Sequence, residues 1–144
     1  MINQFEVVHV NFKYLIGSMG ESKEQAVALV DDYLDETHTE ALDRFTFELI
    51  ITQGSTKRSL HIAYAAVSDK VSGNKHVQLV ELKSDVFLKV TCPLEDYEDL
   101  LHGKYKDAYE SYLKAQGLEI SYSKIYGLIK TFDDHYDIYF NCKI

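Results

Sequence analysis

The densest group of side chains that could take part in chemistry is the run DDHYD near the C-terminus, which holds Asp133, Asp134, His135 and Asp137. Carboxylates and imidazole are common ligands of metal ions in proteins. These groups lie within five consecutive residues between two predicted strands, and a strand hairpin does not easily wrap so short a run around one ion. We therefore expect a solvated turn here and no metal site.

Common catalytic motifs are missing from the chain. It contains no G-x-S-x-G elbow, no phosphate-binding glycine loop and no H-E-x-x-H, and its six histidines are scattered. Cys92 and Cys142 lie far apart, with neither C-x-x-C spacing nor other cysteines near them, which is typical of reduced cysteines in or near a core. The sequence therefore predicts no cofactor and favours a binding protein over an enzyme.

Charge and length limit the remaining classes of function. A chain of 144 residues suits a single domain, and a net charge of −8 argues against a nucleic-acid partner because phosphate binding needs clustered positive charge. Two arginines, Arg44 and Arg58, are present for forked phosphate contacts. No signal peptide is apparent, and the apolar runs are far shorter than the ~20 residues of a membrane span. We expect a cytoplasmic protein without a membrane partner.

The periodicity of apolar residues predicts the order strand–helix–strand–strand in the first half. Residues 5–17 alternate as a strand, and residues 21–36 have helical spacing after the capping-box pair Ser22 and Gln25. Two further alternating segments, 44–53 and 59–67, flank the polar turn GSTKR.

The same order returns after a predicted linker at residues 69–75. The second half has a strand at 76–91 with a break at KSD and a long helix at 93–117 that Gly103 kinks or interrupts. Two strands follow, at 122–132 and 136–144, and a hairpin turn joins them. We therefore predict an α+β fold in one domain, 1–144, built from two strand–helix–strand–strand repeats, 1–68 and 76–144. They would form antiparallel sheet with helices packed on one face.

The strand faces expected to be free of helices are rich in aromatic and polar residues. In the second repeat they hold Tyr122, Lys124, Tyr126, Leu128, Lys130 and Phe132, followed by Asp137, Tyr139, Asn141 and Lys143. In the first repeat they hold Thr46, Glu48, Ile50 and Thr52, followed by His61, Ala63 and Ala65. This mixture suits a ligand cleft or a protein contact surface. The alternative is half-buried packing with solvated tyrosine hydroxyls.

Three segments of the last third carry a family resemblance. SYLKAQGLEI is similar to a helix end written eWLPeSGYe, SKIYGL to a strand written pxxEvY, and YDIYFNCKI to a closing strand written yEIyIPIk. In these segments the chain resembles the GyrI-like family, the effector-binding domains also found behind the DNA-binding helices of bacterial multidrug-responsive regulators. The resemblance covers residues 77–144 by motif and the first half by element order, and it implies the two-repeat fold.

The chain departs from the family pattern at several positions. Tyr112 stands at the family tryptophan, and Lys114 and Asn141 stand at or near family prolines. The strand carboxylate with which many relatives pair cationic ligands falls on Lys124, which reverses the local charge. Glu48 and Glu81 are the nearest replacements that strand periodicity offers, and an edge or solvent-facing position is the alternative for both.

The resemblance implies a ligand cleft between the two repeats, lined by rings from both. The candidate ligand-binding residues are Tyr126, Tyr139, Tyr64, Tyr112, Lys124, Glu48 and Glu81. Aromatic faces stack on planar ligands or attract a cation, an interaction worth about 0.5–2 kcal/mol. Lys124 would instead favour an anionic or carbonyl-bearing ligand.

Two hypotheses of function result. The first is a stand-alone binding protein for a small aromatic or amphipathic molecule, without an N-terminal helix-turn-helix, since the sequence starts directly on a predicted strand. The second is a protein-binding adaptor or inhibitor that uses an acidic and aromatic surface and no small-molecule ligand. The acidic stretches VDDYLDETHTEALD and LEDYEDLL would form part of this protein-binding surface, or they are ordinary solvated helix faces.

An enzymatic activity is the remaining alternative. Hydrolysis of electrophilic compounds, reported for some GyrI-like proteins, would need Tyr126 with Glu48 or Glu81 as acid and base.

Overall fold

The structure, a computed structural model, describes residues 4–121 and 127–143, with the backbone alone at residues 51 and 52. Within these residues the fold is α+β, with three α-helices and two antiparallel sheets. The chain divides into two compact units, which we call unit 1 (Met1–Asn11 with Leu82–Ile144) and unit 2 (Phe12–Glu81). The predicted fold class is confirmed at this level, and the two repeats of GyrI-like type stay a prediction.

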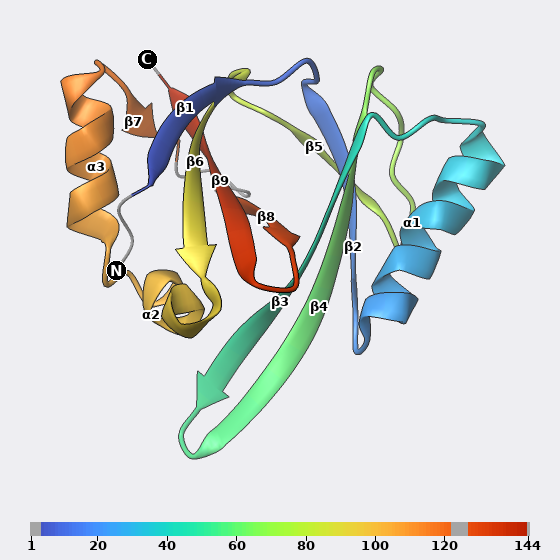
Figure 1. Cartoon of the computed structure of the whole chain (residues 1–144). Helices are drawn as coiled ribbons and strands as arrows, with labels where there is room; N and C mark the ends of the chain where they lie inside the picture. Colours follow the sequence, from blue (N-terminus) through green and yellow to red (C-terminus); the bar gives the residue numbers. More distant parts are fainter. Residues whose placement is uncertain (1–3, 122–126, 144) are drawn as a thin grey trace. The chain divides into compact units, whose positions relative to one another are not determined.

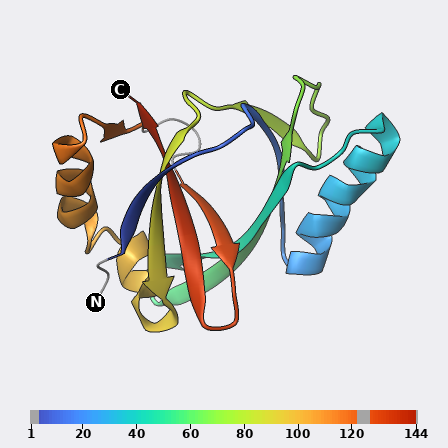
Figure 2. The same ribbon diagram turned by 45° about the horizontal axis from the view of Figure 1, so that its top comes forward.

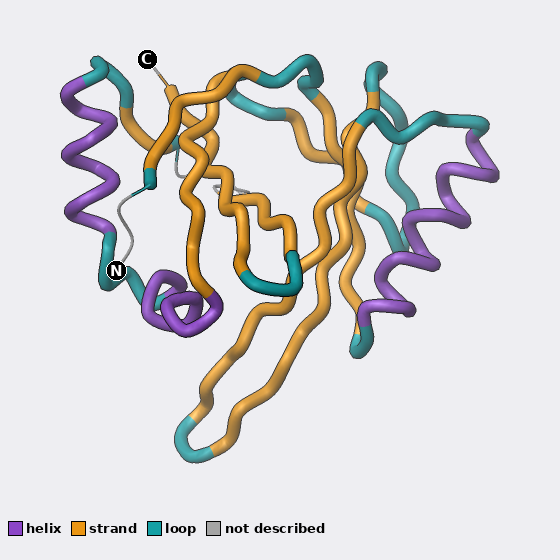
Figure 3. Tube along the Cα trace, viewed as in Figure 1, coloured by secondary structure: helices purple, strands orange, loops and turns teal. Residues whose placement is uncertain are grey.

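Unit 2 is a four-stranded sheet with one helix on it. The strands β2, β3, β4 and β5 lie in the order β3-β4-β2-β5 and span Tyr14–Gly20, Asp43–Gln53, Thr56–Val67 and Gln78–Glu81. The helix α1 (Lys23–Thr37) lies along one face of this sheet (Figure 1). The β3–β4 hairpin continues beyond the end of β2 (Figure 3), because Gly20 already pairs with His61 while β4 begins at Thr56.

The ends of α1 follow from local side-chain chemistry. The Ser22 hydroxyl accepts a hydrogen bond from the Gln25 N–H at 3.1 Å, and the Gln25 side chain accepts one from the Glu21 N–H at 2.8 Å. The first bond satisfies a donor that a helix N-terminus leaves free, as the capping box predicts. The second returns the Gln25 side chain to the residue before the N-cap, one position earlier than in a regular capping box. At the other end His38 adopts a left-handed conformation with φ of 52° and closes the last turn on Asp35 and Leu34.

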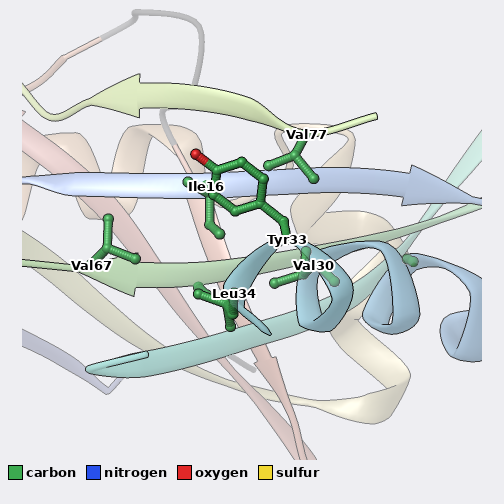
Figure 4. Close-up of a cluster of buried hydrophobic side chains, with 9 residues drawn as sticks. Ile16, Val30, Tyr33, Leu34, Val67 and Val77 are labelled. Carbon is green, nitrogen blue, oxygen red and sulfur yellow. The ribbon is translucent and has the colours of Figure 1, made fainter. Parts of the chain in front are cut away.

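The core of unit 2 corrects one expectation from the sequence. Figure 4 shows Val30, Tyr33 and Leu34 of α1 packed over Ile16 and Val67 of the sheet. Ala63 and Ala65 belong to the same cluster, so the helix covers the sheet face that we expected to be free. The small alanine side chains leave room for a helix to approach the sheet. The larger residues Phe45, Phe47 and Ile62 alternate onto the opposite face.

Unit 1 is built around the last strand of the chain. The strands β1, β6, β7, β8 and β9 span Phe5–His9, Val86–Pro93, Glu119–Ile120, Gly127–Thr131 and His135–Lys143. They lie in the order β1-β6-β9-β7, and β8 also pairs with β9 as a hairpin beside β6 (Figure 2). A short 3₁₀ turn (Leu94–Asp96) and the helices α2 (Tyr97–Leu101) and α3 (Lys106–Ala115) follow β6.

Two predicted elements differ from the structure in their continuity. The predicted strand 5–17 is two strands in different units, because the Val10 N–H bonds to Asp85 of unit 1 while the Phe12 ring contacts Phe45 of unit 2. The apolar alternation runs through this break without a change, so the pattern alone predicted one strand. The long helix is interrupted as expected, at Gly103, whose φ of 85° suits glycine.

Aromatic contacts determine which face of the unit 1 sheet the helices cover. The ring of Tyr97 stacks on that of Tyr136 with centroids 3.8 Å apart, and Tyr109 stacks on Phe140 at 4.8 Å. Both partners lie on β9 two positions from Ile138, so they share one face of that strand. Asp137, Tyr139 and Asn141 consequently lie on the opposite face, as the sequence predicted.

Asn141 joins β9 to the segment before β6. Its amide nitrogen donates to the Ser84 and Val86 carbonyls at 3.0 and 3.2 Å, and its oxygen accepts from the Lys83 N–H at 3.1 Å. Asn141 is 1% exposed, so these backbone groups have little access to water as substitute partners. The side chain therefore has a structural role at the end of the sheet.

We expect Asn141→Leu to lower the free energy of unfolding by about 3 kcal/mol, since three hydrogen bonds are lost at about 1 kcal/mol each. Urea unfolding followed by circular dichroism measures this change. Asn11→Leu is the matched control, because Asn11 is exposed. Equal stabilities of the two variants would contradict the structural role of Asn141.

Candidate functional site

The sheet face of unit 1 opposite the helices brings charged and aromatic side chains from three strands together. Tyr139 of β9 pairs in register with Lys89 of β6 and Leu128 of β8, and Asp137 pairs with Thr91 and Lys130. Residues in register on one face of a sheet are near neighbours. We call Lys89, Lys130, His135, Asp137 and Tyr139 the Asp137 cluster.

Asp137 is the centre of this cluster and is only 8% exposed. Its two carboxylate oxygens face side-chain nitrogens of two residues: Oδ2 lies 3.8 Å from Lys89 Nζ, and Oδ1 lies 3.5 Å from His135 Nε2. A carboxylate so far out of water is tolerated when opposite charge is close. Lys130 is a second ammonium group, on the neighbouring strand. The cluster thus places two lysines around the Asp137 carboxylate, in a chain of net charge −8.

His135 is held from both sides of its ring. Its Nδ1 lies 2.6 Å from Asp134 Oδ1, and its ring stacks on Phe132 across the hairpin turn with centroids 4.6 Å apart. The hydrogen bond with His135 lowers the pKa of the Asp134 carboxyl. In the described part of the chain no three His, Cys, Asp or Glu side chains are arranged to hold a metal ion.

Tyr139 supplies the aromatic surface of the cluster. Its ring packs edge to face with Phe87, with centroids 6.4 Å apart, and Lys130 Nζ lies 5.9 Å from its centroid. The ring is half-buried. A half-buried tyrosine ring beside ammonium groups can stack on a planar molecule while the cations bind its polar group.

The candidate ligand-binding residues of the sequence analysis did not include Lys89, His135 or Asp137, although His135 and Asp137 were considered as metal ligands and judged to belong to a solvated turn. A signal was present for two of them: Lys89 interrupts the apolar strand VFLKV, and Asp137 lies in the strand YDIYF. A charged residue inside such strands indicates either an exposed face or a paired buried charge. The pairing of Asp137 with Lys89 requires that β6 and β9 be neighbours, which the sequence did not show.

The predicted ligand-binding residues of unit 1 lie in different places. Tyr139 belongs to the Asp137 cluster. Tyr112 is on α3, where its ring lies 5.5 Å from that of Phe5 on β1, on the helix side of the sheet. Tyr126 and Lys124 lie outside the described residues.

The predicted residues of unit 2 lie on both faces of its sheet. Tyr64 points away from α1 and stacks on Phe47, with centroids 6.2 Å apart. Its ring also covers Gly17, where an added Cβ would be 2.1 Å from a Tyr64 carbon. Glu48 accepts a hydrogen bond from the Ser59 hydroxyl, and Glu81 pairs with Lys13 at 3.2 Å.

Strand alternation places Glu48 and Glu81 on the α1 side of this sheet, opposite Tyr64. Unit 2 therefore does not bring its three predicted residues onto one face. Their role in binding stays a prediction.

Comparisons with known proteins add little to this description. No family model matches the chain, and no curated protein matches it. Among solved structures, an uncharacterised conserved protein from Listeria innocua aligns with 97% of this chain and 92% of its own, at 10% sequence identity and a TM-score of 0.49. Such a similarity supports no functional conclusion. In the described residues no helix is long and apolar enough to cross a membrane.

Burial raises the pKa of Tyr64 to about 12, whereas tyrosine in an unfolded chain ionises near pH ~10. Between these values the unfolded state has lost a proton that the native state keeps, so the free energy of unfolding falls as pH rises. We expect the free energy of unfolding of Tyr64→Phe to decrease less than that of the wild type between about pH 10 and 12. Urea unfolding at several pH values measures it, and slopes equal to wild type would show that Tyr64 is not buried as described.

The Lys89–Asp137 pair can be tested with a double-mutant cycle of Lys89→Met and Asp137→Asn. We expect Lys89→Met to destabilise the protein, because it removes one cation from a nearly buried carboxylate, and the coupling energy to be on the order of 1 kcal/mol. Lys104 and Asp99 form an exposed pair at 3.3 Å and serve as the matched control, for which we expect a smaller coupling. Equal coupling in both pairs would contradict a special role for Asp137.

Proposed function

We propose that the protein binds a small molecule that carries an aromatic ring and an anionic or carbonyl group, with the Asp137 cluster as the recognition site. The observation that carries the proposal is the nearly buried Asp137 carboxylate, held between Lys89 and His135 beside the ring of Tyr139. Charged groups with a few convergent partners next to aromatic surface are typical of ligand sites.

The balance of charge supports the class of ligand. Lys89 and Lys130 both lie beside Asp137, whereas the second carboxylate nearby, Asp134, is hydrogen-bonded to His135. Two ammonium groups therefore accompany the one carboxylate between them. A ligand carboxylate or carbonyl can share these donors, and its ring can stack on Tyr139. The GyrI-like resemblance points to the same broad function, that of an effector-binding domain. Tyr126 and Lys124, which precede β8 in the sequence, remain candidates for the same ligand.

A second candidate function is a protein-binding adaptor or inhibitor. The observation that favours it is Leu94, which is 44% exposed and is followed by the exposed carboxylates of Glu95, Glu98 and Asp99. An apolar side chain beside acidic groups suits a basic, partly apolar segment of a partner protein.

A thermal-shift screen with anionic, neutral and cationic naphthalene derivatives tests the first function. A ligand at a hundred times its dissociation constant adds about 2.7 kcal/mol, which raises the melting temperature by roughly 5–10 °C in a domain of this size. We expect the anionic compound to give the largest shift.

Variants locate the binding site of any hit. Lys89→Met should weaken binding about tenfold or more through loss of a charge-assisted contact, and Tyr139→Leu should weaken it through loss of stacking. Lys104→Met is the matched control, since Lys104 is exposed outside the cluster. Unchanged affinity in both cluster variants would reject the site. The absence of any shift would reject the ligand-binding function and leave the adaptor function as the better hypothesis.

A further inference from the structure

A separate groove of about 560 Å³ lies between α3 and the edge strand β7 in unit 1. It is lined by Glu110, Lys114, Gly117, Leu118, Glu119, Ile120 and Lys143. Figure 1 shows α3 running beside β7, with the connection between them at one end. The volume is within the range of about 300–1,000 Å³ that is typical of small-molecule sites.

The turn after α3 forms one end of this groove. The Gly117 N–H bonds to the Lys114 carbonyl at 3.1 Å and the Leu118 N–H bonds to the Leu113 carbonyl at 3.0 Å. Together with the φ of 73° at Gly117, these bonds make a Schellman motif. This motif ends the helix, turns the chain into β7, and places the apolar residues Leu118 and Ile120 in the groove.

The charges around the groove are unequally compensated. Glu119 pairs with Lys143 at 3.5 Å, and Glu110 pairs with Lys106 at 3.9 Å. Lys114, in the last turn of α3, has no ion-pair partner among the described residues. The groove therefore combines an apolar surface with one ammonium group that no carboxylate of the described chain neutralises.

We propose that this groove is a second binding site, for a small amphipathic anion. The apolar part of the ligand would lie chiefly on the half-buried Leu118, since Ile120 is only 3% exposed, and its carboxylate or sulfonate would accept hydrogen bonds from Lys114. A cationic ligand is disfavoured, because both carboxylates of the groove already have cationic partners. This site is independent of the Asp137 cluster, with which it shares no lining residue.

Fluorescence titration with 8-anilinonaphthalene-1-sulfonate tests the proposal, with sodium decanoate and decyltrimethylammonium bromide as competitors. We expect decanoate to displace the probe and the ammonium compound to fail. Lys114→Glu should raise the dissociation constant of the probe by about tenfold or more, the effect of losing a charge-assisted contact. Lys104→Glu makes the same charge change at an exposed position outside the groove and should alter it by less than about twofold.

Two further results distinguish this site from the Asp137 cluster. Because the probe is itself an anionic naphthalene of the class proposed for the Asp137 cluster, the effect of Lys114→Glu on probe affinity is measured again in the Tyr139→Leu background, where it should persist. Amide signals of residues 114 and 117–120 should also shift in a ¹⁵N correlation spectrum on addition of decanoate, which carries no ring to stack on Tyr139. The proposal is overturned by equal effects of Lys114→Glu and Lys104→Glu, by loss of probe binding in Tyr139→Leu, or by the absence of probe binding to wild type. The amide shifts with decanoate and the Lys114→Glu effect in the Tyr139→Leu background distinguish failure of the groove from failure of the Asp137 cluster.

Discussion

Hydrogen bonding to β9 is the constraint on which unit 1 depends. This strand pairs with β6 over seven residue pairs, with β8 over five and with β7 over two. Because side chains alternate along a strand, the register of β9 decides which residues face the helices. A slip of one residue would place Asp137 and Asn141 under α2 and α3 and would expose Ile138 and Phe140. Asn141 supports the observed register, since it binds the backbone of residues 83–86 from the end of the strand.

Both candidate sites of unit 1 are consequences of this arrangement. The Asp137 cluster exists because β6 and β8 flank β9 and bring their lysines alongside Asp137 on the face without helices. The groove exists because β7 pairs with the other end of β9, where Glu119 meets Lys143, and α3 lies against β7. The pairing of β6 and β8 with β9 also explains how Asp137 can be nearly buried. Burying this carboxylate alone would be costly, and lysines on the adjacent strands compensate its charge.

Much of the local structure was predictable because its causes are local. The capping residues Ser22 and Gln25, the interruption at Gly103, the break around residues 83–85 and the hairpin before β9 all depend on neighbouring residues in the sequence. Two expectations failed where distant contacts decide. The segment 5–17 alternates throughout, yet its ends pair with strands of different units. The alanine-rich face of β4 was expected to be open, whereas α1 covers it.

The sequence by itself determined the α+β class, the positions and ends of the helices, and the face of β9 that carries Asp137, Tyr139 and Asn141. These properties depend on periodicity, turn residues and capping, which act over a few positions. Tertiary structure alone decided that Lys89 lies beside Asp137, that Tyr64 covers Gly17, and that α3 and β7 enclose a groove beside Lys114. The physical reason is that strand neighbours and helix placement depend on contacts between residues far apart in the chain, and periodicity carries no information about which strands become partners.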